Sequence, residues 1–211
     1  AVAALAASAA FAQSSVTLYG VADAYFGSEK AGAVSQTVVN DGGLSTSRIG
    51  VSVKEDLGAG LSAFAVIEGA VQLDGGAGGL GANRKSVVGL SGDFGAVSLG
   101  RQQTPLQDVV ESTIDAQATS GFSALTAAAN RNAVQAAGSG LNAQTRYVNS
   151  VRYDSPNFDG FSGAVQVGLG ENKGVGVSAG RNVAFNLAYA NGPVAVALGH
   201  QNDKVVGGAA A

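Results

Sequence analysis

The chain has 211 residues, including 32 glycines and no cysteine, and its formal net charge is −3. Without cysteine it has no disulfide framework, thiolate metal site or cysteine nucleophile. Twelve basic residues, scattered along the chain and outnumbered by fifteen acidic ones, exclude a nucleic-acid partner, which needs clustered positive charge. The charged fraction is 13%, whereas about a quarter is usual in soluble domains. The composition favours β-structure with close strand packing over a helical domain.

Residues 1–12, AVAALAASAAFA, are uncharged and apolar, and they end in the small-x-small pattern of Ala10 to Ala12. This pattern is typical of the end of a secretory signal peptide, with cleavage before Gln13. The stretch is too short to span a bilayer. We therefore expect residues 1–12 to be the remnant of an export signal and residues 13–211 to belong to the exported protein. The alternative is a short alanine-rich helix of the mature protein.

Short stretches of alternating apolar and polar residues run from Ser14 to His200, and no apolar run is long enough for a membrane helix. In the first stretch Val16 and Leu18 share an apolar face, while Tyr19 lies on a mixed one. This alternation is typical of a membrane-spanning β-barrel, with one face toward lipid and the other toward water. In two stretches, 84–92 and 95–103, apolar and polar residues do not separate cleanly onto two faces. Nine strands are predicted, at residues 15–27, 46–56, 60–73, 84–92, 95–103, 145–155, 160–170, 181–190 and 193–202.

The predicted connections alternate between short and long, as in barrels with tight periplasmic turns and longer outer loops. The longest is 104–144, and a structureless connection of this length is uncommon unless it has a function. We expect it to fold back into the lumen and narrow it; the alternative is a flexible, solvent-exposed outer loop. The tight turns lie at 55–58, 91–95, 156–160 and 191–193, and the longer segments near 28–45, 74–83, 104–144 and 171–180.

Four segments make the chain resemble a known family. They are SSVTLYGVADAYF at 14–26, SRIGVSVKEDLGAGLSAFAVIEGAV at 47–71, RKSVVGLSGDFGAVSLGRQQTPLQD at 84–108 and NSVRYDSPNFDGFSGAVQVGLGE at 149–171. In order and spacing they closely resemble the general diffusion porins of β-proteobacterial outer membranes. The resemblance implies an all-β fold, a sixteen-stranded transmembrane antiparallel β-barrel whose third loop folds inward. About nine of these strands are present, so we expect this to be an N-terminal part of the barrel.

The resemblance also implies a function. Such porins are exported to the outer membrane, lie in lipid and lipopolysaccharide, assemble as homotrimers, and let small hydrophilic solutes and ions diffuse passively without a cofactor. Their constriction opposes basic wall residues to acids on the inward loop. At the matching positions here, the basic wall is Arg48, Arg84 and Arg146, and the acidic loop is Asp108, Glu111 and Asp115. Further pore-lining candidates are Lys85, Arg101, Arg152 and Glu68.

Opposed charges across a narrow aqueous path create a field that sorts solutes by size and charge. Three wall arginines favour the passage of anions, whereas the acids of the loop favour cations. For each arginine the alternative is a structural ion pair with a loop carboxylate. The loop lacks the PEFG-type motif of some porins, and Gly121-Phe122 is its nearest remnant.

The sequence offers no enzyme chemistry. Its single histidine, His200, has no GxSxG nucleophile elbow to work with, and we expect it to face solvent or an interface. One histidine without cysteine leaves no metal site beyond carboxylates, and no EF-hand spacing is present. The glycines at 75–79 are followed by no GK[ST], so they predict a flexible turn and no phosphate loop.

Alternation alone does not distinguish a barrel from a secreted surface or adhesin module whose apolar face is a packed core. The residues on the other face make the distinction. A packed core would not accept Arg48, Lys54, Glu68 and Arg152 unpaired. The barrel interpretation is therefore favoured, with the adhesin module as the alternative.

Overall fold

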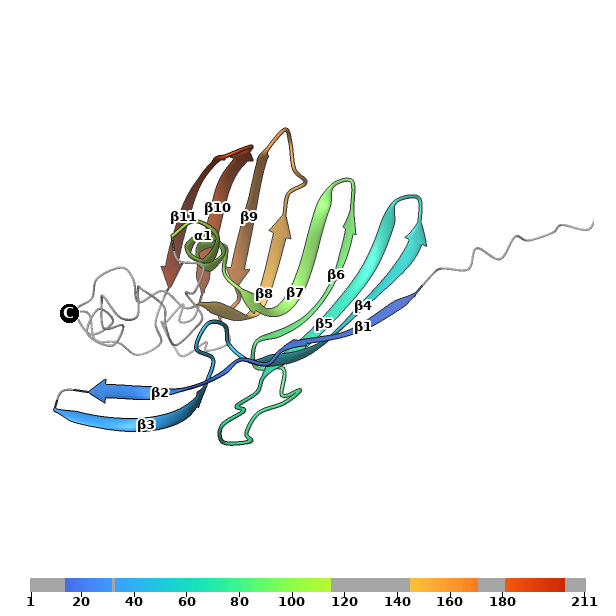
Figure 1. The fold of residues 1–211 in the computed structure, drawn as a ribbon. Coiled ribbons are helices and arrows are strands. Elements are labelled where there is room, and N and C mark those ends of the chain that lie inside the picture. Colours follow the sequence, from blue (N-terminus) through green and yellow to red (C-terminus); the bar gives the residue numbers. More distant parts are fainter. Residues whose placement is uncertain (1–13, 32, 115–144, 171–180, 204–211) are drawn as a thin grey trace, which may run out of the picture.

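The computed structural model describes residues 14–31, 33–114, 145–170 and 181–203 (Figure 1). Strands dominate this part of the chain, and its helical segments are short. A one-turn helix and a π-helical turn follow the seventh strand. In chain order the elements are β1 (Ser15–Val21), β2 (Ala24–Ala31), β3 (Val34–Asp41), β4 (Arg48–Gly58), β5 (Leu61–Ala70), β6 (Lys85–Gly92), β7 (Gly95–Gln103), α1 (Pro105–Val109), the π-helical turn Val110–Ile114, β8 (Arg146–Asp154), β9 (Phe161–Gly168), β10 (Asn182–Asn191) and β11 (Val194–Asp203).

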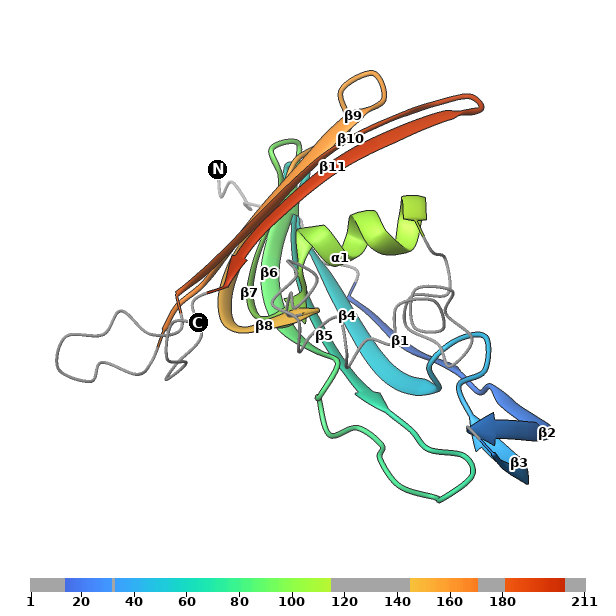
Figure 2. The same cartoon turned by 90° about the vertical axis from the view of Figure 1, so that its left-hand side faces the viewer.

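Nine strands form one antiparallel sheet in the order β1-β4-β5-β6-β7-β8-β9-β10-β11. The sheet bends into a deep arch, and α1 lies on its concave side (Figures 1 and 2). The hairpin of β2 and β3 pairs separately and projects from one end of the arch. Within the described residues, the arch is the wall of an antiparallel β-barrel.

Short and long connections lie at opposite ends of the arch. The turns β4–β5, β6–β7, β8–β9 and β10–β11 stand together at one end, and the longer segments leave from the other (Figure 1). Neighbouring antiparallel strands enforce this separation, because each strand reverses the direction of the chain. The predicted tight turns at 91–95, 156–160 and 191–193 are confirmed. The one predicted at 55–58 is misplaced, because these residues belong to β4 and the turn follows at Ala59 and Gly60.

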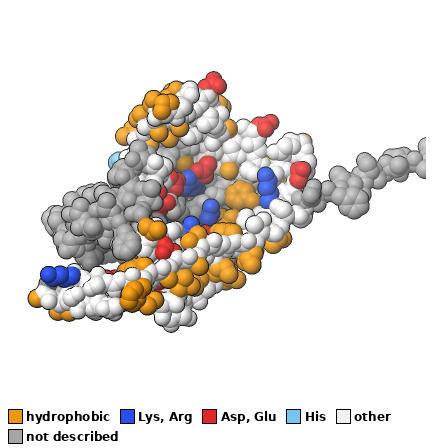
Figure 3. Space-filling view, viewed as in Figure 1, with side chains coloured by type: hydrophobic (Ala, Val, Ile, Leu, Met, Phe, Trp, Pro, Cys, Tyr) orange, Lys and Arg blue, Asp and Glu red, His pale blue; other side chains and the backbone are white. Residues whose placement is uncertain are grey.

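The two faces of the sheet have opposite polarity. Large apolar side chains cover the convex side and are exposed; Val16, for example, is 71% exposed. The concave side carries buried polar side chains, including Gln166 and Ser150, and charged groups gather in its hollow (Figure 3). A soluble sandwich has the reverse arrangement, with apolar side chains in its core. Other exposed apolar residues include Leu18, Val88, Leu99, Val165, Phe185 and Leu198.

The predicted single strand over residues 15–27 is wrong, because the sheet strand β1 ends at Val21. The chain then turns at Asp23 into the hairpin of β2 and β3, which occupies most of the segment expected to be a long loop. Residues of this hairpin alternate weakly, with Phe26 opposite Val39 as its large apolar pair. Both side chains are exposed, so no buried face marks the hairpin in the sequence.

The two stretches that did not sort by alternation, 84–92 and 95–103, are β6 and β7. Val87 faces the concave side and is buried there, although it is apolar. In β7 the pairing with β8 shifts between Gly100 and Gln102. Gly100 adopts a φ of +125° at this irregularity, which residues with a side chain rarely tolerate. Such a shift interrupts the alternation of side chains between the two faces of the sheet, and the strand prediction depends on that alternation.

Candidate functional site

A cavity of about 510 Å³ opens on the concave side of the arch. Its lining is almost entirely polar, and nine of its twelve residues are charged. Five of these are basic and four acidic, so the lining carries a formal charge of +1. The residues are Ser45, Arg48, Glu68, Arg84, Lys85, Gln102, Gln103, Asp108, Glu111, Arg146, Arg152 and Asp154.

The cavity brings together most of the residues singled out in the sequence. Of the expected basic wall, Arg48, Arg84 and Arg146 all line it, and so do Asp108 and Glu111 of the expected acidic side. Lys85, Arg152 and Glu68 also line it. Arg101 does not; its Nε donates to the carbonyl oxygen of Asn83 at 2.7 Å. Asp115 and the Gly121-Phe122 pair lie outside the described residues.

The start of the long connection after β7 is held on the concave side by α1. Thr104 caps this helix, since its Oγ1 accepts a hydrogen bond from the Gln107 amide at 3.3 Å, and Pro105 occupies the first turn. Asn186 of β10 donates to the carbonyl oxygen of Pro105 at 2.9 Å.

Gly199 of β11 allows α1 to approach the wall. A Cβ at this position would lie 2.8 Å from Leu106 Cδ1, closer than side chains pack. The helix therefore rests directly on β10 and β11, where Val109 is buried (Figure 2). Residues 104–114 thus lie inside the arch, and residues 115–144 of the expected constriction segment lie outside the described residues.

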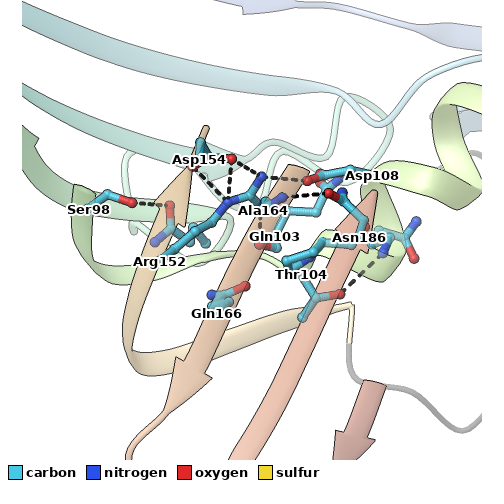
Figure 4. Close-up of polar contacts among 12 residues, drawn as sticks. Ser98, Gln103, Thr104, Asp108, Arg152, Asp154, Ala164, Gln166 and Asn186 are labelled. Carbon is cyan, nitrogen blue, oxygen red and sulfur yellow. Dashed lines mark hydrogen bonds and ion pairs between the residues drawn. The ribbon is translucent and has the colours of Figure 1, made fainter. Parts of the chain in front are cut away.

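Arg152 is the centre of one charged cluster (Figure 4). Its Nη2 lies 2.7 Å from Asp108 Oδ2 and 2.6 Å from Asp154 Oδ1. Its Nε donates to both carboxylate oxygens of Asp154 at 3.0 Å, and its Nη1 donates to the carbonyl oxygen of Gln103 at 3.0 Å. Gln103 Nε2 also donates to Asp108 Oδ1 at 3.2 Å. One guanidinium thus ties β8 to α1 and is neutralised by two carboxylates.

Glu68 is the centre of a second cluster. Its Oε1 accepts from Arg84 Nε at 2.6 Å, and its Oε2 accepts from the hydroxyl of Tyr19 at 2.9 Å. Arg48 Nε stands 3.9 Å from Glu68 Oε2, at the outer limit of an ion pair. Arg48 makes its closer contacts elsewhere, with Ser45 Oγ at 3.0 Å and the carbonyl oxygen of Thr46 at 2.9 Å. Here one carboxylate lies between two guanidinium groups.

Arg146 and Lys85 differ from the other cations of the cavity. Within the described part of the chain, neither side chain has a hydrogen bond or an ion pair, although both line the cavity. Arg146 stands at the start of β8, opposite Gln103, and its side chain is half-buried. Its charge therefore acts on the cavity without a bonded counter-ion.

Burial raises the pKa of the Asp108 carboxyl above its ordinary value, because desolvation disfavours the charged form. Arg152 acts in the opposite direction, through its charge and its hydrogen bond. The nearby acids Asp154 and Glu111 add to the rise. Asp108 of α1 therefore takes up a proton more readily than an exposed aspartate does.

Sequence reasoning missed Asp154 and Tyr19. Asp154 lies two residues after Arg152 on the same strand, and a period of two places both on one face, so this spacing could have identified it. Tyr19 shares the parity of Thr17 on the concave face of β1, but only the cross-strand arrangement brings its hydroxyl to Glu68. Expected roles for the cavity residues otherwise remain predictions.

The described residues contain no group of three or more histidine or acidic side chains that could hold a metal ion. No helix among them has the length and apolar character needed to cross a membrane. His200 lies on β11 opposite Phe185, and the two rings stand 5.3 Å apart between centroids. An antiparallel sheet that is apolar on its convex side and charged on its concave side defines the wall of a membrane β-barrel.

Comparison with known proteins agrees with this class. The sequence profile of the Gram-negative porin family matches residues 1–211. Outer membrane porin protein 32 of Delftia acidovorans is 40% identical over 219 residues, which cover 100% of this chain and 61% of that protein. Major outer membrane protein P.IB of Neisseria meningitidis serogroup B is 34% identical, covering 89% of this chain and 54% of that protein.

Among solved structures, an anion-selective porin from Comamonas acidovorans matches with a TM-score of 0.78 and 34% identity, over 92% of this chain and 59% of that one. The chain belongs to the Gram-negative porin family. It is a β-barrel protein of the outer membrane and not an enzyme. It spans 61% of the Delftia relative, so the activity and assembly of the whole protein are matters for proposal.

Proposed function

We propose that the protein forms a water-filled channel through the outer membrane, with the charged cavity as its constriction. Small hydrophilic solutes and ions pass by diffusion, and the protein works as a homotrimer surrounded by membrane lipid and lipopolysaccharide. Residues 1–12 serve in export. The single observation that carries the proposal is the position of the cavity, which lies on the concave side of the arch and is lined by nine charged residues.

The charges of this cavity favour anions. Its formal charge is +1, and two of its five cations have no bonded counter-ion in the described part of the chain. Arginine keeps its charge at any relevant pH, so its contribution does not vary with conditions. A low-dielectric wall around an aqueous path concentrates the field of such a charge on a passing ion. The similarity to a porin that is described as anion-selective supports this sign.

Arg146 contributes most to the preference. Arg48 and Arg84 both lie near Glu68, whose charge offsets part of theirs. Arg146 has no such partner within the described residues. A passing anion can therefore contact this guanidinium without displacing a carboxylate, so removing Arg146 lowers the anion preference more than removing either of the others.

Planar-bilayer recording of protein purified from outer membranes tests the proposal. Steady ohmic steps are expected, with a reversal potential in a KCl gradient that indicates chloride preference. Arg146→Ala lowers the chloride-to-potassium permeability ratio by roughly twofold, and Arg48→Ala and Arg84→Ala lower it less. Lys54→Ala is the matched control, because Lys54 lies on the same strand as Arg48 but about 20 Å along it.

Correctly folded protein that conducts no ions would refute the channel and favour a surface module without transport activity. A permeability ratio that falls equally in Arg146→Ala and Lys54→Ala would refute the constriction while leaving the channel in place.

A further inference from the structure

We propose that Asp23 is a positioning residue, which sets the orientation of Arg48 in the charged cavity although it does not line the cavity itself. The proposal rests on the function proposed above, in which Arg48 is part of the basic wall. It concerns the turn at residues 42–47, which leads from the β2–β3 hairpin into β4.

Asp23 holds this turn by its carboxylate and its backbone. Its Oδ2 accepts hydrogen bonds from the amides of Leu44 at 2.7 Å and Ser45 at 2.6 Å. Its backbone carbonyl oxygen accepts from the amide of Gly42 at 2.8 Å. Hydrogen bonds in which the acceptor is ionised are about twice as strong as neutral ones. Three amides of one short turn thus depend on a single residue.

Ser47 completes the connection at the start of β4. It is fully buried, and its hydroxyl both accepts from the Asp23 amide at 2.9 Å and donates to the Asp23 carbonyl oxygen at 3.0 Å. Its own carbonyl oxygen accepts from the amide of Val71 at 3.0 Å. The turn is therefore fixed to the wall on both sides, at Asp23 and at the end of β5.

Arg48 binds the same turn from the side that faces the cavity. Its Nη1 donates to Ser45 Oγ at 3.0 Å and to the Thr46 carbonyl oxygen at 2.9 Å. Ser45 is thus held by Asp23 through its amide and holds Arg48 through its hydroxyl. This relay draws the guanidinium toward the turn, so that its Nε remains 3.9 Å from Glu68.

Loss of the relay changes the charge that the cavity presents. A guanidinium released from Ser45 can move onto Glu68, whose carboxylate Arg84 now engages at 2.6 Å. Arg48 and Arg84 then compete for one acid, and less positive charge faces the aqueous path. Asp23 thereby acts on selectivity through Arg48 alone.

Two substitutions separate the hydrogen bonds of Asp23 from its charge. Asp23→Ala and Asp23→Asn both remove one negative charge, but the asparagine carbonyl oxygen can still accept from Leu44 and Ser45. In planar bilayers Asp23→Ala lowers the chloride-to-potassium permeability ratio by less than about twofold and by no more than Arg48→Ala does, whereas Asp23→Asn keeps the wild-type ratio. In an Arg48→Ala background Asp23→Ala has no further effect, because the residue it positions is gone.

Equal ratios in Asp23→Ala and Asp23→Asn would overturn the proposal, as would an undiminished effect of Asp23→Ala in the Arg48→Ala background. Amide hydrogen exchange of the folded protein tests the relay independently of conduction. Slow exchange at Leu44 and Ser45 is expected in wild type and Asp23→Asn and fast exchange in Asp23→Ala. Fast exchange in wild type would also overturn the proposal. Folded wild-type protein that shows this protection but does not conduct would refute the channel and, with it, the role of Asp23 in selectivity.

Discussion

The two charged clusters of the cavity have opposite compositions. On β4 to β6 one carboxylate, Glu68, lies between Arg48 and Arg84, and on β8 and α1 one guanidinium, Arg152, lies between two carboxylates. The first cluster carries a formal charge of +1 and the second −1. An ion in the cavity therefore meets a potential that changes sign from one part of the lining to another.

The clusters also differ in what they connect. Glu68 and its partners all belong to the wall or its immediate connections, so their pairing adjusts the charge of a surface that backbone hydrogen bonds already hold. Arg152 joins the wall to α1, a single helical turn whose other contacts include the apolar packing on Gly199 and the hydrogen bond from Asn186. We infer from this difference that the Glu68 cluster mainly sets ion selectivity, whereas the Arg152 cluster mainly holds α1 in place.

Removing Arg152 is expected to have the largest effect on stability. In Arg152→Ala, Asp108 and Asp154 stay close together without the cation between them, and breaking a part-buried pair in this way costs about 3 kcal/mol. The free energy of unfolding should fall by that order, measured by urea titration of the folded protein in lipid with circular dichroism. Lys54→Ala removes the same charge away from the clusters and should leave stability unchanged. A stability equal to wild type in Arg152→Ala would show that α1 does not depend on the cluster.

Removing the centre of the other cluster should have a smaller effect on stability and a clear effect on selectivity. In Glu68→Gln the amide oxygen can still accept from Arg84 or Tyr19, so the expected cost is about 1 kcal/mol. The cluster changes from +1 to +2, so the chloride-to-potassium permeability ratio should rise. Glu29→Gln on the exposed hairpin is the matched control. A ratio that falls or stays constant in Glu68→Gln would contradict the division of roles.

Much of this fold could be predicted because a period of two is a local property. Each of the nine predicted strands overlaps a strand of the sheet, although the first runs past the end of β1 into the hairpin. Parity alone placed Arg48 and Glu68 on the charged face. The family resemblance supplied Arg84 and Arg146 as wall residues, and both line the cavity. The roles of Arg84 and Arg146 in conduction remain predictions.

The remainder depends on register, which alternation does not encode. The pairing of β7 with β8 shifts after Gly100, so parity no longer indicates which of Arg101 and Gln102 faces the cavity. The structure places Gln102 there and not Arg101. The turn that joins Asp23 to Arg48 was missed for a related reason, since it depends on side-chain hydrogen bonds to backbone amides more than twenty residues away.

The smallest expected change in stability comes from Asp108, the member of the Arg152 cluster on α1. In Asp108→Asn the guanidinium of Arg152 keeps its contacts with Asp154, so the free energy of unfolding at neutral pH should change by less than about 1 kcal/mol. The variant removes one negative charge from the cavity, so its chloride-to-potassium permeability ratio at neutral pH should exceed that of wild type.

Acidification of the wild-type protein should have the same direction of effect. Burial raises the pKa of Asp108 above its ordinary value of 3.8, so the folded state binds this proton more tightly than the unfolded state. The stabilising contribution of that proton is present below 3.8 and is lost as the pH rises through the folded pKa. Between pH 3.8 and the folded pKa, protonation of Asp108 should raise the chloride-to-potassium permeability ratio of wild type. It should not lower the free energy of unfolding. As the pH is lowered from about 7 to about 4, the reversal potentials of wild type and Asp108→Asn should therefore move toward each other, because each Asp108 side chain that takes up a proton becomes neutral like the asparagine. A constant difference between the two proteins across that range would show that Asp108 keeps its charge, and that the opposite signs of the two clusters persist in acid.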